Sequence, residues 1–125
     1  MPDGMPDGMP DSPDSPGSPN GLVVLTTVAT QEDALRLARF LVDRGLAACV
    51  QTMPQMVSIY RWQGAVEQAN ETLLLIKTTK NSYPHLEAAI KQNHPYQTPE
   101  IIALPIEAGL PEYFDWLSAS VRFPL

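Results

Sequence analysis

The sequence predicts one domain of the α+β class, in which an antiparallel sheet carries helices packed on one face. A length of 125 residues suits one compact domain and is too short for two ordinary ones. An apolar content of 44% is enough to form a core. Apolar segments with strand or helix periodicity follow one another as strand, helix, strand, strand, helix, strand and helix, which is the pattern that indicates this class.

Residues 1–20 differ in composition from the rest of the chain. They read MPDGMPDGMPDSPDSPGSPN and contain six of the 13 prolines, four aspartates and no basic residue. Such a segment cannot bury enough apolar surface to offset the entropy of ordering it. We therefore expect a disordered Pro/Asp-rich tail at 1–20, usable as an interaction arm or for soft-metal capture by its methionine thioethers, and a folded domain at 21–125.

The first half of the domain reads as strand, helix and strand. Leu22–Val28 is an unbroken apolar and β-branched run, typical of a buried strand. Thr30 precedes acidic residues and can cap a helix, whose apolar side chains recur at helical spacing. Gly45 ends this helix, because a left-handed residue is favoured there. A second strand is expected to begin at once with Leu46–Val50.

A long hairpin follows. Met56–Trp62 is rich in β-branched and aromatic residues, Gln63-Gly64 suits a two-residue turn, and a returning strand runs from Ala65 to about Lys80. Pro54 predicts a bend or bulge in the first strand of the hairpin, because proline cannot donate to the ladder.

The remaining elements are a helix, a strand and a helix. Asn81 or Ser82 can cap the second helix, which should end before Pro95. A strand is expected at Glu100–Leu104, and Pro111 opens a third helix. This last helix should bury either Tyr113 or Phe114, either Trp116 or Leu117, and also Val121. The order predicts the split β-α-β, ferredoxin-like topology with an added C-terminal helix.

The hairpin is too long for its own domain. Two strands of about 15 residues reach about 50 Å, whereas a domain of about 100 residues is only about 33 Å across. The tip, with Tyr60, Trp62 and Val66, should therefore project, and an unsupported two-stranded ribbon is marginal in water. We expect sister copies to cover it in a cyclic trimer, with a dimer, or a ribbon folded back on its own sheet, as the alternatives.

Composition argues against several classes of partner. Without the tail, ten acidic side chains face eight basic ones, so the domain lacks the cationic surface that nucleic acid requires. No apolar run approaches the roughly 20 residues that span a bilayer, and no secretory signal is evident, so we expect a cytoplasmic protein. The single cysteine, Cys49, excludes an internal disulfide and a multi-cysteine zinc site.

Several motifs together resemble one known family. In order along the chain they are LAACV (46–50), YRWQG (60–64), Glu71 with LIKTT (75–79), HPYQTPE (94–100) and YFDW (113–116). By these motifs the chain is similar to the CutA family of divalent-cation tolerance proteins over residues 22–122. The resemblance implies a homotrimer of ferredoxin-like subunits that share long strands. It also implies a role in tolerance of divalent metal ions, copper above all, and a trimer like that of the PII signal-transduction proteins.

The resemblance also implies a copper site, which this sequence retains only in part. The family positions for a cysteine and two histidines correspond here to Thr26, Asn93 and His94, so His94 is the one candidate metal ligand. His94 could instead serve a structural role at a helix end. Cys49 matches a family cysteine, with a small core residue as the alternative interpretation.

A second group of family-pattern positions suggests a cleft between subunits. Its candidate residues are Tyr60, Trp62, Glu67, Lys77, Tyr96 and Glu100. Lys77 follows an apolar run, where a lysine needs a carboxylate partner such as Glu67 or Glu100, or a ligand anion. The group is therefore either a structural ion pair with aromatic packing, or a cleft that accepts a small anion or a metal complex.

No local catalytic signature is present, since the chain lacks a glycine-rich phosphate loop, HExxH and CxxC. We therefore expect a binding module and not an enzyme. The first hypothesis is a trimer that binds a divalent metal ion, with copper as the first candidate, through His94 and neighbouring carboxylates. The alternative is a PII-like signalling or scaffold trimer that binds a small ligand in the intersubunit cleft and leaves its tail free for a protein partner.

Overall fold

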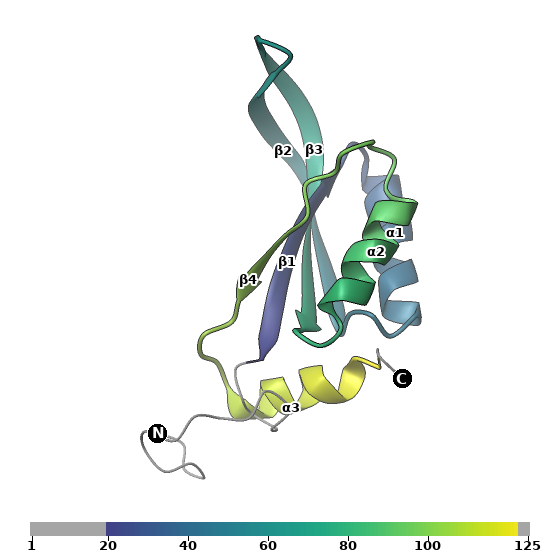
Figure 1. The fold of residues 1–125 in the computed structure, drawn as a ribbon, viewed down its shortest axis with the longest axis vertical. Helices are drawn as coiled ribbons and strands as arrows, with labels where there is room; N and C mark the ends of the chain where they lie inside the picture. The colour runs from purple at the N-terminus through teal and green to yellow at the C-terminus, as the bar shows by residue number, and fades with distance from the viewer. Residues whose placement is uncertain (1–19, 123–125) are drawn as a thin grey trace.

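A computed structural model describes residues 20–122 (Figure 1). The elements are β1 (Gly21–Val28), α1 (Gln31–Asp43), β2 (Cys49–Trp62), β3 (Ala65–Thr79), α2 (Tyr83–Asn93), β4 (Ile102–Pro105) and α3 (Pro111–Ser120). The four strands form one sheet in the order β2-β3-β1-β4, and every neighbouring pair is antiparallel. The predicted ferredoxin-like topology with a C-terminal helix is therefore confirmed.

Helices α1 and α2 cover one face of the sheet and enclose the main core. Thr30 caps α1, as predicted, and its Oγ1 accepts a hydrogen bond from the backbone N–H of Asp33 at 3.1 Å. Because side chains alternate along a strand, the even-numbered residues of β1 and β3 face these helices. The core cluster includes Val24, Val28, Leu37, Leu41, Leu74, Ile76, Leu86 and Ile90.

The other face of the sheet is only partly covered. A Cβ atom at Gly21 would lie 3.6 Å from Phe114 and 3.7 Å from Leu117, so α3 packs across one end of this face. The rest of it, which we call the open sheet face, has no covering element among the described residues. Its apolar side chains are Val23, Leu25, Leu73, Leu75, Ile102 and Leu104.

Beyond the sheet, β2 and β3 continue as a two-stranded ribbon, Met56–Trp62 paired with Ala65–Glu71. β1 pairs with β3 only over Thr72–Thr79, so within residues 20–122 these seven residue pairs, about 23 Å long, have no further strand beside them. Figure 1 shows the ribbon projecting past both helices. Exposed apolar side chains on the ribbon include Val57, Ile59, Trp62 and Val66. The predicted projection is confirmed for the single chain.

The two irregularities predicted for the hairpin are both present. The register shifts by one residue between Met53 and Met56, where Pro54 and Gln55 form a bulge and Gln55 has a φ of 65°. At the tip, Gln63 and Gly64 have φ values of 51° and 84°, which are the two positive values of a type I′ turn.

The starts of two strands differ from the sequence prediction, and the structure settles which residues α3 buries. β2 begins at Cys49 instead of Leu46, because Leu46 and Ala47 are buried in the preceding loop, where the Leu46 carbonyl accepts a hydrogen bond from Thr78 Oγ1. β4 begins at Ile102, two residues later than expected. In α3, Phe114 and Leu117 are the buried members of the two pairs left open by the sequence, whereas Val121, expected to be buried as well, follows the end of the helix and is half-buried.

The tail predicted for residues 1–20 lies outside the described residues except for Asn20, whose carbonyl accepts a hydrogen bond from the Lys80 N–H at 3.0 Å. Among the helices of residues 20–122, none has the length and apolar content that crossing a bilayer requires.

A matched pair of threonines gives a stability prediction. Thr26 and Thr78 are both fully buried, but Thr26 Oγ1 has no hydrogen-bond partner among the described residues, whereas Thr78 Oγ1 donates to Leu46 O at 2.7 Å. Thr26→Val should raise the free energy of unfolding by about 1 kcal/mol, because it removes a buried hydroxyl that is unsatisfied. Thr78→Val should lower it by about 1–2 kcal/mol. Urea denaturation of both variants measures this, and the same sign for both would contradict the hydrogen-bond assignment.

Candidate functional site

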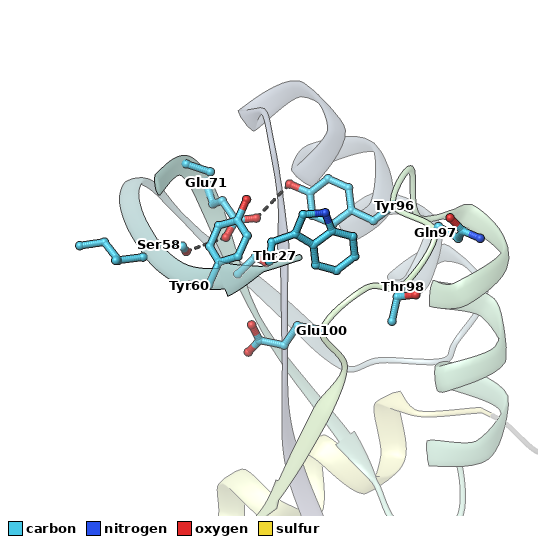
Figure 2. Close-up of a pocket in the computed structure, with 11 residues that line it drawn as sticks. Thr27, Ser58, Tyr60, Glu71, Tyr96, Gln97, Thr98 and Glu100 are labelled. Carbon is cyan, nitrogen blue, oxygen red and sulfur yellow. Dashed lines mark hydrogen bonds between the residues drawn. The ribbon is translucent and has the colours of Figure 1, made fainter. Parts of the chain in front are cut away.

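A cavity of about 660 Å³ lies where the ribbon leaves the sheet. Its walls come from the end of β1, from the ribbon, and from the segment 96–100 that connects α2 to β4 (Figure 2). The residues that line it are Thr27, Ser58, Ile59, Tyr60, Trp62, Ala69, Glu71, Tyr96, Gln97, Thr98 and Glu100. Three segments far apart in the sequence therefore meet at one site.

Glu71 holds two walls of the cavity together. Its Oε1 accepts a hydrogen bond from Ser58 Oγ at 2.6 Å, and its Oε2 accepts one from Tyr96 Oη at 2.9 Å. Figure 2 shows Glu71 joined to Ser58 and Tyr96 by these two bonds. Because both donors are neutral, neither of them cancels the negative charge of the Glu71 carboxylate.

His94 fixes the third wall to β1. β4 pairs with β1 only as far as Leu25, so the edge carbonyl of Thr27 needs another donor. His94 Nε2 lies 2.7 Å from Thr27 O, and the backbone N–H of Tyr96 donates to His94 Nδ1 at 3.1 Å. A carbonyl can only accept and an N–H can only donate, so Nε2 carries the ring hydrogen and Nδ1 accepts. The histidine is 8% exposed.

Tyr96 links the His94 and Glu71 contacts. Its ring centroid lies 4.7 Å from that of His94, and its hydroxyl donates to Glu71. Burial, followed by the hydrogen bond to Glu71, raises the pKa of Tyr96 from 10.0 to about 12. The neutral phenol is therefore the form that this site favours.

This pKa predicts a loss of stability at high pH. A raised folded-state pKa contributes stability that is complete below pH 10 and is lost as the pH rises through about 12. The fall in unfolding free energy across this range should therefore be smaller in Tyr96→Phe than in the wild type. Burial and Glu87 also raise the pKa of Tyr83 to about 12, so Tyr83→Phe is the matched comparison. It should likewise reduce the fall in unfolding free energy at high pH, by an amount independent of Tyr96. Identical slopes in Tyr96→Phe and wild type would contradict the prediction.

The structure brings together four of the six residues predicted for a cleft. Tyr60, Trp62, Tyr96 and Glu100 line the cavity. Glu67 lies on the ribbon opposite Tyr60 but does not line it. Lys77 lies six residues along β3 from Glu71, opposite Cys49, and its Nζ donates to Gln51 Oε1.

Glu71, Ser58 and Thr27 belong to the site but were absent from the predicted set. In the sequence Glu71 stands out only as part of a family motif, although an acid just before the apolar run Leu73–Ile76 is a signal that it serves a purpose. No feature of the sequence pointed to Ser58 or Thr27.

In the structure, each of the predicted metal-ligand positions has different neighbours. Both ring nitrogens of His94 are engaged by backbone groups, Thr26 is fully buried on the helix-covered face, and Asn93 donates to Ala89 O at 2.8 Å. Cys49 is a free, half-buried thiol on the open sheet face. Within residues 20–122, no three His, Cys, Asp or Glu side chains gather closely enough to hold a metal ion. Metal binding at His94 stays a prediction, and it requires breaking one of two hydrogen bonds.

Similarity to known proteins agrees with the fold. Residues 22–120 match the family of the CutA1 divalent ion tolerance protein. The chain is 53% identical over 95 residues to the divalent-cation tolerance protein CutA of Thermus thermophilus, a match that covers 76% of this chain and 92% of that protein. A solved structure of the divalent cation tolerance protein from the same organism superposes with a TM-score of 0.79 at 50% identity, covering 81% of this chain and 98% of that one.

A more distant solved structure is the protein described as the periplasmic divalent cation tolerance protein CutA of Archaeoglobus fulgidus. It superposes with a TM-score of 0.79 at 35% identity and covers 82% of this chain and 99% of that one. The family match spans most of the domain, and the motifs that suggested it lie in β2, β3, α3 and the segment after α2. The chain therefore belongs to the CutA1 divalent ion tolerance family.

Proposed function

We propose that this protein is a homotrimeric binding module that acts in the tolerance of divalent metal ions. Two surfaces support the assembly. Leu104 and Ile102 on the open sheet face are about half exposed, and no other strand of residues 20–122 covers the ribbon. A contiguous apolar surface of this kind marks an interaction site. The role in metal tolerance follows from membership of the family.

We favour a binding function over catalysis. The sequence carries none of the local catalytic motifs considered above, and the described lining of the cavity combines two carboxylates, three aromatic rings and several hydroxyls, a set of groups suited to holding a ligand. We also favour a cytoplasmic location, as expected from the sequence. One solved family member is described as periplasmic, so fractionation of the native host is the direct test.

Copper is the metal that we propose first, with His94 as its ligand. Copper(II) binds imidazole nitrogen well, but here it must displace Thr27 O or the Tyr96 N–H from the ring, so we expect binding to be weak. Calorimetric titration of the wild type with CuCl₂ should give saturable heat, and His94→Ala should reduce it. Absence of heat in the wild type, or equal heat in both proteins, would remove copper at His94 from the proposal.

The second candidate function is a PII-like module that binds a small molecule. The observation that favours it is the cavity, whose volume of about 660 Å³ falls in the range of small-molecule sites. Titration with small charged and neutral probes separates this function from direct metal binding, since a metal ion needs neither the volume nor the aromatic walls.

A further inference from the structure

The charge of the cavity is the first clue to its ligand. Its lining, as far as residues 20–122 provide it, includes Glu71 and Glu100 and contains no lysine, arginine or histidine. Lys77, which would have favoured an anion, lies outside it and donates to Gln51. A small anion would therefore meet two carboxylates and no compensating cation from the same chain, so the part of the cavity that one subunit supplies selects against anions and favours positive charge.

The aromatic walls give the second clue. Tyr60, Trp62 and Tyr96 line the same cavity, and the face of each ring attracts a cation, with tryptophan the strongest. Trp62 is 57% exposed in the single chain, although exposing an indole to water is unfavourable unless a ligand or partner covers it. A positively charged group that carries apolar substituents satisfies both the rings and the carboxylates.

The lining is poorly suited to a bare metal ion. Hard divalent cations take six or more oxygen ligands, and softer ones prefer imidazole or thiolate, which the described lining lacks. Both oxygens of Glu71 already accept hydrogen bonds, from Ser58 and Tyr96. A volume of about 660 Å³ is also far larger than a metal ion needs.

We propose that this cavity binds an organic ammonium ion, a quaternary or alkylated amine, with Trp62 and Tyr60 against its apolar substituents and Glu71 and Glu100 balancing its charge. The proposal rests on the ligand-binding function above and names the chemical class of the ligand. It differs from the small anion or metal complex expected from the sequence, because Lys77 of the same chain does not line the cavity.

The test uses the full chain and three probes in calorimetric titrations. Choline chloride supplies a quaternary ammonium, 3,3-dimethylbutan-1-ol has the same shape without the charge, and sodium acetate supplies an anion. Choline should bind with a dissociation constant of about 1 mM or lower, and the neutral isostere should bind at least about tenfold more weakly. Equal binding of the two, or binding of acetate alone, would overturn the ammonium class while leaving a ligand-binding module standing.

Variants locate the binding. Trp62→Leu and Glu100→Gln should each weaken choline binding by about fivefold or more. Trp116→Leu and Glu112→Gln, the same substitutions on α3 outside the cavity, should leave it unchanged. Unchanged binding in Trp62→Leu would overturn the site, and saturable CuCl₂ heat that is lost in Glu100→Gln would identify a metal site instead. If none of the three organic probes binds to a sample that light scattering shows to be trimeric, the ammonium proposal fails, while the trimer and the wider ligand-binding function stand.

Discussion

Leu104→Asp is expected to convert the protein from a trimer to a monomer of 13.7 kDa. Leu104 lies opposite Val23 on the open sheet face and is half exposed in the single chain, so a carboxylate there is solvated in a monomer. In an assembly that covers this face, each copy would instead bury an unpaired charge at a cost of several kcal/mol. Light scattering coupled to gel filtration measures the mass of each form.

Leu35→Asp is the matched control for this variant. Leu35 is 41% exposed on α1, on the opposite side of the sheet, and its substitution should leave the trimer intact. A wild type that is already monomeric at micromolar concentration would contradict the proposed assembly. A trimeric Leu104→Asp protein would show instead that the copies meet through another surface.

His94→Ala is expected to lower the free energy of unfolding by about 2–4 kcal/mol. The substitution leaves the Thr27 carbonyl and the Tyr96 N–H without their partner and opens a void between β1 and the segment 96–100. Denaturant titration measures the total effect. Amide hydrogen exchange should localise it, with the Tyr96 N–H losing protection first.

His85→Ala is the comparison, because His85 is exposed near the start of the same helix. We expect it to change stability by less than about 0.5 kcal/mol. Equal effects of the two histidine variants would mean that the His94 contacts contribute little. That result would also leave His94 free to bind metal without the cost argued above.

The fold was predictable because its signals are local. The Gln63-Gly64 turn, the Pro54 bulge and the Thr30 cap each depend on the conformational preferences of one or two residues, and all three are present. The start of β2 was not predictable, because Leu46 and Ala47 are apolar enough for a strand but are buried in a loop. Long-range packing decides between those two states.

The candidate site was predictable only in part, for a related reason. Periodicity placed Tyr60 and Trp62 on one face of the ribbon, and both line the cavity. Periodicity could not show whether Lys77 lies near Glu100. Their relative positions depend on the register of β3 against β2 and on the path of the segment after α2. Glu71 was overlooked because its role depends on Tyr96, a residue 25 positions later whose hydroxyl only the tertiary fold brings within 2.9 Å.

The bulge at Pro54 and Gln55 shifts the alternation of side chains between the two faces of β2 by one residue. Before it, odd-numbered residues such as Cys49 and Met53 share the face of Lys77 and Leu73, and after it the even-numbered Tyr60 pairs on that face with Glu67. If the same sequence ran through Pro54 and Gln55 in regular alternation, without a bulge, the odd-numbered residues of β2 would stay on that face as far as the tip. The aromatic rings would then point away from Glu71, and Arg61 would take their side. One extra residue in an otherwise regular strand therefore decides whether aromatic rings or a guanidinium line the mouth of the cavity.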